Sequence, residues 1–447
     1  MKHIKIAEAL SEIDDRYIAE AAKHNKKRRA VWFSAVAAIL VVVILWWSFA
    51  NPVITAKAIS LADYSQNQRQ QYDTVRAHSN HLLPFFSRIT GQVLSGNSGK
   101  NMAFSPLNLY LALAATAELS GGNEQILSLL DAKSLEALRS QASCIWNASY
   151  RDRDNQCLLA GSLWLDKDLS YDQQTMDILA KQYYTCVYQG DFGTRKTNRD
   201  IANWLNKQTG GLLKDSTDGI DLSSDILLAF YSTIYYQAKW SSEFSSSENT
   251  QGVFHSSSGD MDCTYMNKQK TWGNYMWGDS FGAITIGLKD GSRMWLILPD
   301  EGKSVDDVLA SDDLHATVFR SGYEEGLDNC KYMLINLTLP KFDIRASGDL
   351  KEDLRALGVT DVFDENAADF PAVTGINGNA WLTAVNQATR VAIDEKGVTA
   401  ASYIEFPMAG SAAPPEEIID FILDRPFIFV ITNHYDLPLF AGVVNEP

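Results

Sequence analysis

The spacing of hydrophobic and polar positions changes near the middle of the chain. The first half holds long apolar runs at helical spacing, of which PLNLYLALAATAEL from Pro106 is an example. The second half holds short runs rich in β-branched and aromatic residues, bounded by Gly, Asp and Pro. These strand-like runs are ILLAFYSTIYYQA, AITIGL, MWLILP, MLINLTLP, TRVAID and PFIFVIT. Helices early and strands late predict one α+β domain with large sheets.

Residues 30–50 form a long apolar run near the N-terminus. They carry no charge across 21 positions, and a helix of that length matches a bilayer core of about 30 Å. The basic stretch KHNKKRR precedes the run, and a basic flank is typical of the cytoplasmic side. The pattern predicts a retained single-pass anchor. A cleaved signal peptide ending near Ala56-Lys57-Ala58 is the alternative.

This membrane helix would divide the chain into four parts. They are a cytoplasmic tail at 1–29, the transmembrane helix at 30–50, a polar stalk at 51–75 and one large domain at 76–447. The predicted location is the cell membrane, with the N-terminus in the cytoplasm and the C-terminal domain outside the cell.

Charge and cysteine content exclude several classes of protein. A formal net charge of −16 makes nucleic-acid binding unfavourable. The five cysteines include no CxxC pair and are odd in number, which argues against a zinc ribbon and a full disulfide framework. Scattered, mostly buried thiols are expected.

The sequence lacks the familiar catalytic motifs. It has no G-x-S-x-G, H-E-x-x-H, Walker or G-x-G-x-x-G motif, and its seven histidines show no metal-ligand spacing. We therefore expect no metal and no cofactor, and the enzyme class is disfavoured. An extracellular enzyme acting on glycans stays open, because 11 tryptophans and many carboxylates could line a cleft that a sequence cannot show.

Seven groups of residues resemble, in the same order, motifs of the serpin family. Each is weak alone, but their order from about residue 80 to the C-terminus is specific. They are NMAFSP at 101–106, NWL at 203–205 with Thr209 and Gly211, IYY at 234–236 with Lys239, Trp240 and Phe244, PKF at 340–342, Leu357-Gly358 with ADF at 368–370, DRPF at 424–427 and LFAG at 439–442. The chain thus resembles a serpin, and we expect a membrane-anchored member of the bacterial type.

The resemblance implies a fold and an exposed loop that a protease cleaves. Serpins are single large α+β domains with three β-sheets, about eight to nine helices and an exposed reactive loop that a protease attacks. In this chain the loop would lie within DEKGVTAASYIEFPMAGSAAPPEE at 394–417. Its hinge would consist of Glu395, Lys396, Gly397, Val398, Thr399, Ala400, Ala401 and Ser402.

The residues of this segment suit a strand that can enter a sheet. Gly397 permits a backbone swing at little steric cost. In a strand every second side chain points the same way. From Val398 onward one such set is small or apolar, namely Val398, Ala400, Ser402, Ile404, Phe406 and Met408. The alternation predicts a half-buried strand with these even-numbered side chains inward.

The family's spacing from Glu395 implies that the bond to be cut joins Ser411 to Ala412. The next candidate bond joins Met408 to Ala409. Small residues at the cut favour elastase-like or subtilisin-like serine proteases.

A polar cluster beneath the opening sheet is also implied, with members Ser105, Asn108, Ser232, Gln387 and Trp240. Three of them depart from the family. Ser232 stands where Asn is usual, Asn108 where a second Ser is common, and Gln387 where His is often found. Because hydrogen-bonding residues replace one another, we expect a rewired network.

The function implied by the resemblance is inhibition of serine proteases by a suicide-substrate mechanism. The reactive loop is cleaved, inserts into the main sheet and traps the acyl-enzyme. The expected partner is an extracellular serine protease in a covalent complex, and the expected protein is a monomer. The alternative is a non-inhibitory binding protein on the same fold at the cell surface.

Overall fold

The computed structural model describes residues 54–447 with nine internal gaps. The gaps fall at 67, 97–98, 154, 212–219, 221, 224–225, 321–327, 375–379 and 399–416. The expected tail and membrane helix lie outside the described residues. Within the described ranges, no helix has both the length and the apolar character needed to cross a bilayer.

A seven-stranded sheet forms one of the two large layers. Its strand order is β1 (Lys57–Ser60), β5 (Thr185–Gly190), β3 (Gln156–Asp166), β6 (Leu228–Lys239), β15 (Gly397–Val398), β14 (Asn386–Asp394) and β12 (Phe342–Asp349). Among the described pairs of this sheet, β3–β5 is parallel and the others are antiparallel. The short strand β15 is antiparallel to both of its neighbours.

A nine-stranded sheet forms the other large layer. Its strand order is β16 (Ile418–Ile422), β11 (Cys330–Pro340), β8 (Gly259–Trp277), β9 (Phe281–Gly287), β10 (Arg293–Pro299), β17 (Phe427–Thr432), β18 (Pro438–Val444) and β2 (Met102–Phe104), with β7 (Thr250–Ser256) paired to β8. In the described part of the chain a third sheet consists of β4 (Ser170–Tyr171) and β13 (Val373–Thr374).

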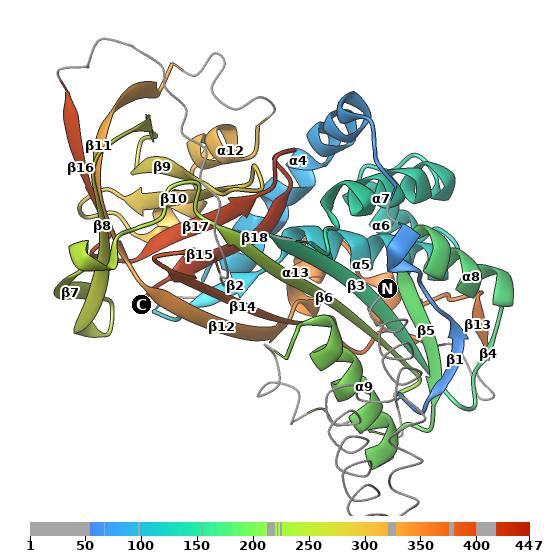
Figure 1. The fold of residues 1–447 in the computed structure, drawn as a ribbon. Coiled ribbons are helices and arrows are strands. Elements are labelled where there is room, and N and C mark those ends of the chain that lie inside the picture. The colour runs from blue at the N-terminus through green and yellow to red at the C-terminus, as the bar shows by residue number, and fades with distance from the viewer. Residues whose placement is uncertain are drawn as a thin grey trace, which may run out of the picture. The chain divides into compact units, whose positions relative to one another are not determined.

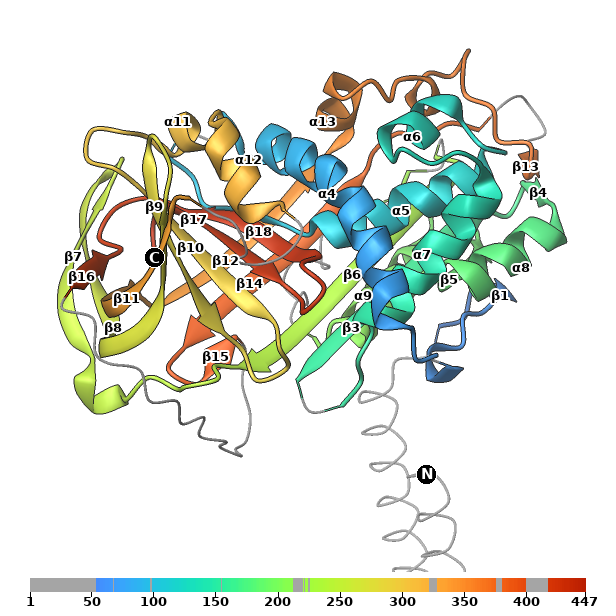
Figure 2. The same ribbon diagram turned by 90° about the horizontal axis from the view of Figure 1, so that it is seen from above.

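Nine α-helices are found in the described part of the chain. They are α4 (Tyr72–Leu94), α5 (Pro106–Leu119), α6 (Glu124–Leu129), α7 (Leu135–Ser149), α8 (Gln173–Gln182), α9 (Arg195–Gln208), α11 (Val305–Leu309), α12 (Asp312–Val318) and α13 (Lys351–Ala356). In Figures 1 and 2 most of the nine-stranded sheet lies at the left, and helices α6, α7 and α8 lie at the right.

Helix α5 connects the two large sheets. Every residue of α5 is buried, and the helix packs against both β6 and β18. A helix with apolar residues on every side is stable when protein surrounds it. PLNLYLALAATAEL has this character apart from Asn108, Thr116 and Glu118, which are also buried. Ser105 fixes its start, because the Ser105 hydroxyl accepts a hydrogen bond from the N–H of Asn108 and Pro106 occupies the first turn.

The structure confirms the predicted fold class. Residues 55–447 form one compact unit, and the described chain contains three sheets and nine α-helices. All six strand-like runs of the second half are strands: β6, β9, β10, β11, β14 and β17. Cys144, Cys157 and Cys186 are buried thiols, as expected.

The stalk expected at 51–75 is wrong in part. Strand β1 lies within it and pairs antiparallel with β5 at the edge of the seven-stranded sheet. Thr55 donates hydrogen bonds from its N–H and its hydroxyl to the carboxylate of Asp200 on α9. Helix α4 already begins at Tyr72. An edge strand has one open side and needs little apolar surface, so its composition resembles that of a linker.

Candidate functional site

The two residues of β15 lie inside the seven-stranded sheet. Val398 is opposite Ile393 of β14 on one side and Ala238 of β6 on the other. Its side chain is only 2% exposed. Two residues of the expected hinge, Gly397 and Val398, are therefore already in a strand, and Val398 points inward as the alternation predicts.

Gly397 is required by the close approach of β6. A Cβ atom at this position would lie 2.3 Å from the carbonyl oxygen of Ala238 and 2.6 Å from the Cα of Lys239. The φ angle of Gly397 is +154°, which side-chain-bearing residues rarely adopt. Both constraints exclude any other residue at this point of the sheet.

Glu395 is held by two partners in the turn that precedes β15. Its Oε1 is 2.5 Å from Lys341 Nζ and accepts a 2.5 Å hydrogen bond from Asn249 Nδ2. Burial alone would raise the pKa of Glu395, but the hydrogen bonds from Lys341 and Asn249 outweigh it and lower the pKa to about 2. The carboxylate is therefore charged and fixed in the neutral pH range.

Trp240, the residue that directly follows β6, supports the hinge. Its indole Nε1 donates to the carbonyl of Asp394 at 2.8 Å, and its backbone N–H donates to the carbonyl of Lys396 at 3.1 Å. The side chain is fully buried. The sequence placed Trp240 in the polar cluster beneath the sheet. The structure assigns it to the hinge instead, because Trp240 lies at the β15 end of β6, eight residues along from Ser232.

A gap opens in the sheet beyond β15. In the described residues no register pairs β6 directly with β14, and β15 separates them for two residues only. A cavity of about 500 Å³ occupies the region, lined mainly by 228–233 of β6, 347–349 of β12 and 386–388 of β14. The sheet thus has unfilled space beside two strand edges.

Two of the five expected cluster residues, Ser232 and Gln387, line this gap, and Gln387 is hydrogen-bonded to a third, Ser105. Ser105 and Gln387 bind each other twice: the N–H of Ser105 donates to Gln387 Oε1 at 2.7 Å, and Gln387 Nε2 donates to the carbonyl of Ser105 at 3.2 Å. The Ser105 hydroxyl accepts from the N–H of Asn108. Ser232 of β6 lines the same cavity as Gln387. These hydrogen bonds join the start of α5 to β14.

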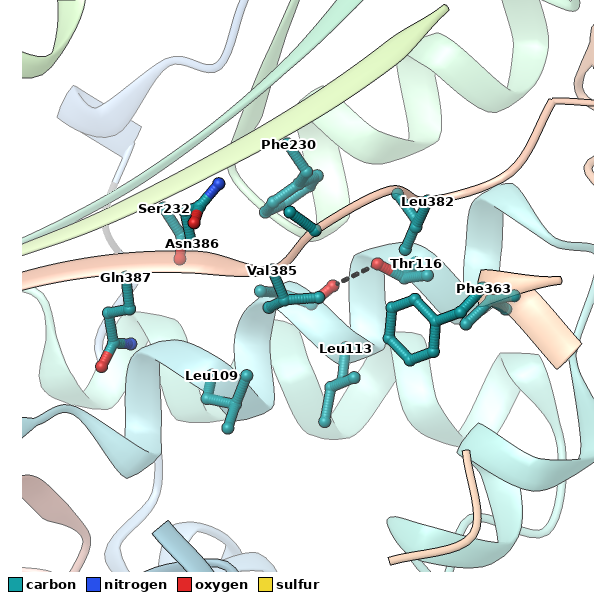
Figure 3. A pocket seen from close by; sticks show the side chains of 13 residues that line it. Leu109, Leu113, Thr116, Phe230, Ser232, Phe363, Leu382, Val385, Asn386 and Gln387 are labelled. Carbon is teal, nitrogen blue, oxygen red and sulfur yellow. Dashed lines mark hydrogen bonds between the residues drawn. The ribbon is translucent and has the colours of Figure 1, made fainter. Parts of the chain in front are cut away.

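A second, small cavity separates α5 from the strands that border the gap (Figure 3). Its volume is about 20 Å³, and its lining is mainly apolar. Figure 3 shows Leu109 and Leu113 of α5 below Phe230 of β6 and Asn386 of β14. The Thr116 hydroxyl donates to the carbonyl of Ala112 in its own helix. The side chains of α5 and of the sheet that face this cavity are thus mainly apolar.

The remaining expected site residues lie outside the described part of the chain. They are Thr399, Ala400, Ala401 and Ser402 of the hinge, Ser411 and Ala412 of the first candidate bond, and Met408 and Ala409 of the second.

Three residues of the site were not predicted from the sequence as site residues. Lys341 and Asn249 bind Glu395, and Thr389 of β14 faces the core with a buried hydroxyl that has no hydrogen-bond partner in the described residues. Lys341 belongs to the PKF motif, but nothing local connects it with the hinge. Asn249 is 146 residues from Glu395, so only the fold brings them together.

Comparison with known proteins gives one consistent family. The family model described as serpin (serine protease inhibitor) matches residues 83–447. Plasminogen activator inhibitor 1 of Mus musculus is 26% identical over 390 residues, which cover 83% of this chain and 93% of the relative. Serpin-ZX of Arabidopsis thaliana is 25% identical over 372 residues, which cover 78% and 93%.

Solved structures show the same fold. The thermophilic serpin tengpin in its native state has a TM-score of 0.72 at 22% identity, covering 88% of this chain and 100% of that one. The Arabidopsis protein AtSerpin1 in its native stressed conformation has a TM-score of 0.71 at 24% identity, covering 85% and 100%. The family model covers residues 83–447, most of the described chain. The chain therefore belongs to the serpin family, whose members are inhibitors of serine proteases and not enzymes.

Proposed function

We propose that this serpin is a suicide substrate for an extracellular serine protease. One observation carries the proposal: β15 enters the sheet at Gly397 and Val398, and the space that its continuation would fill is open between β6 and β14. A strand whose described part ends beside the gap is positioned to continue into it.

The register of β15 predicts which residues would flank each loop residue after insertion. Because β15 is antiparallel to both flanking strands, each step along the loop moves back one residue on β14 and one on β6. In this register Ala400 would lie between Val391 and Tyr236, Ser402 between Thr389 and Ile234, and Ile404 between Gln387 and Ser232.

The receiving strand has the matching alternation. On β14 the buried side chains are Gln387, Thr389, Val391 and Ile393, and the residues between them are more exposed. Directly opposed residues share one face of a sheet. The even-numbered loop side chains would therefore enter the core, as Val398 already does.

Insertion would be favourable by several kcal/mol. Ile404, Phe406 and Met408 would be buried at roughly 1.5–3 kcal/mol each, or about 5–9 kcal/mol together. Each new ladder hydrogen bond would add about 0.5–1.5 kcal/mol. Val398 is already buried and adds nothing further. The uninserted form would be metastable and held by a kinetic barrier.

Pro407 is compatible with this insertion. It has no N–H and would leave one ladder hydrogen bond unmade. In the same register it would lie opposite Ala229 of β6 and beyond the first residue of β14, Asn386. The missing donor would thus fall at the end of the strand.

The chemistry of trapping would follow the protease's own mechanism. The protease serine attacks the carbonyl carbon of Ser411, the peptide bond breaks, and the new amine of Ala412 leaves with the proton supplied by the protease histidine. The protease remains joined to Ser411 as an ester. The released segment inserts, carries the protease with it and distorts its active site, so water no longer cleaves the ester.

Small residues at the bond favour an elastase-like or subtilisin-like target, since such enzymes have shallow pockets. Met408–Ala409 is the second candidate bond and would suit the same enzymes or a chymotrypsin-like one. In the proposed arrangement the apolar run at 30–50 holds the inhibitor at the cell surface, where such proteases act.

Gel electrophoresis under denaturing conditions tests the proposal. The full chain is mixed with elastase-like and subtilisin-like proteases, and we expect a band at the summed mass of inhibitor and protease. A protease with its serine blocked is the control and gives no band. The mass of the released C-terminal peptide identifies the bond, because it begins at Ala412 or at Ala409. Clean cleavage without the larger band would support the non-inhibitory alternative.

A further inference from the structure

An exposed apolar patch lies on the nine-stranded sheet where β8, β11 and β16 run side by side (Figure 1). Its members Trp272, Tyr332 and Ile418 are 39%, 57% and 50% exposed. Trp272 is opposite Leu334, and Leu334 is opposite Ile418, so these side chains form one row across three strands. We call Trp272, Tyr332, Leu334 and Ile418 the sheet-face patch.

The sheet-face patch is not part of the core. The other face of β11 supplies the core here, with Met333 and Ile335 buried. The rings of Trp272 and Tyr332 stack with centroids 5.3 Å apart and planes at 15°, so the two largest side chains already hold each other in place. Single exposed apolar residues are common, but a contiguous row containing a stacked aromatic pair marks an interaction surface.

Polar groups border the sheet-face patch. On one side Asn336 Nδ2 donates to Asp420 Oδ1 at 2.7 Å. At the end of β11, Lys331 forms an ion pair with Glu417. An apolar centre with a polar rim is the usual anatomy of a protein interface, and Trp and Tyr supply most of the binding energy in such interfaces.

The position of Ile418 in the chain indicates the occupant. Only five residues lie between Ala412 and Ile418, and the six residue steps that join them span at most about 22 Å. A globular protease of roughly 200 residues has a radius of gyration of about 16–17 Å. A protease that grips the Ser411–Ala412 bond must therefore come close to the sheet-face patch.

We propose that the sheet-face patch is a second contact surface for the protease that attacks the loop, and that it binds apolar residues on the rim of the protease's active-site cleft. The proposal rests on the proposed function. The sheet-face patch would help to select the target protease. Small residues at the cleaved bond discriminate only weakly between proteases, because one methylene changes binding by only about 1–3 kcal/mol. A rigid aromatic pair outside the cleft adds selectivity at little entropic cost.

The test compares the double variant Trp272→Ala/Tyr332→Ala with Tyr72→Ala in the full chain. Tyr72 on α4 is a matched control, because it is 56% exposed and its ring lies 5.4 Å from that of Tyr435. The measured quantity is the second-order rate of loop attack by a panel of elastase-like, subtilisin-like, chymotrypsin-like and trypsin-like proteases. The melting temperature of each variant reports whether it is folded.

We expect the double variant to slow loop attack by the preferred protease about tenfold, which corresponds to roughly 1.4 kcal/mol. Trp272→Phe keeps an aromatic ring and should retain most of the rate. Tyr72→Ala should equal the parent. A free peptide of residues 404–417 should be cut without the protease preference that the parent shows, since it lacks the sheet-face patch.

Equal rates for the double variant and the parent across the panel would overturn the proposal. So would sedimentation data in which the parent self-associates and the double variant does not, with no change in attack rate, because the occupant would then be a second copy. The measured rate includes every cleavage of the loop, whether the protease is afterwards trapped or released. A parent that is cleaved without trapping therefore refutes the inhibitory function but still decides this proposal. A parent whose loop no protease attacks overturns both.

Discussion

Glu395 and Lys341 form an ion pair, Oε1 to Nζ 2.5 Å, between the turn before β15 and the single residue that separates β11 from β12. Strand β11 belongs to the nine-stranded sheet and β12 to the seven-stranded sheet. The ion pair thus holds the hinge at the point where the chain passes from one large sheet to the other. Opening of the seven-stranded sheet at the hinge would therefore have to break or rearrange this ion pair.

Acid should break the ion pair between Glu395 and Lys341. The pKa of Glu395 is about 2 in the folded protein against an ordinary value of 4.5. A lowered folded-state pKa means that the carboxylate stabilises the folded form above about pH 4.5, and that this contribution is lost as the pH falls toward 2. The melting temperature of Glu395→Gln should lie below that of the parent at neutral pH, and the difference should shrink between pH 4.5 and 2.

Glu301→Gln is the control for this pH series. Glu301 is exposed on a turn, so its substitution should shift the melting temperature little at any pH. If the difference between the parent and Glu395→Gln stays constant from pH 7 to pH 2, the ion pair does not hold the hinge.

Gly397→Ala should expel β15 from the sheet. The added Cβ would meet the backbone of β6 at 2.3 Å, and the φ angle is unfavourable for alanine. We expect a loss of roughly 1–3 kcal/mol in stability, measured by denaturant unfolding, and faster proteolysis near the hinge. Gly348→Ala in β12 is the control, because nothing lies within 4 Å of a Cβ at that position. Equal effects of the two substitutions would contradict the close-approach argument.

Arginine substitutions test which face of the loop enters the sheet. Ala400→Arg would place a charge between Val391 and Tyr236, both of which are buried. Burying an unpaired charge is costly, so trapping should fail and roughly tenfold more inhibitor should be cleaved for each protease captured. Ala401→Arg, on the other face, should trap like the parent. A reversed pattern would invalidate the register. Val398→Arg is less diagnostic, because Val398 is buried before any cleavage.

Thr389 and Ser402 should become partners only after insertion. The Thr389 hydroxyl is buried without a partner in the described residues, and such a group destabilises by about 1–3 kcal/mol. Thr389→Val should therefore leave the intact protein as stable as the parent or more stable, and should reduce the stability gained on cleavage. A double-mutant cycle with Ser402→Ala should show coupling in the cleaved form and none in the intact form. Absence of coupling in the cleaved form would mean that the loop adopts another register.

Cleavage within the loop should raise the melting temperature. Insertion contributes at least about 5–9 kcal/mol by the burial argument, and for a domain of this size each kcal/mol corresponds to about 1 °C. Differential scanning calorimetry of intact and nicked protein should therefore differ by at least roughly 5–10 °C. A nicked protein that melts no later than the intact one would rule out insertion.

Local patterns in the sequence determined much of this protein. The apolar run from Pro106 predicted α5 residue for residue, and six short apolar runs predicted six strands, because periodicity and chain composition act over neighbouring residues. The alternation from Val398 predicted its inward orientation for the same reason. The glycine at 397 indicated a hinge, since only glycine fits strained or crowded backbone.

Tertiary structure alone decided the rest. The partners of Glu395, the place of Trp240 beside the hinge, the unpartnered hydroxyl of Thr389 and the pairing of β1 with β5 all depend on segments far apart in the chain. So does the position of β15, because a two-residue strand has no periodicity of its own and is defined by the two strands that flank it. Contacts of this kind form only when the whole chain packs, and no short window of sequence contains both of their sides.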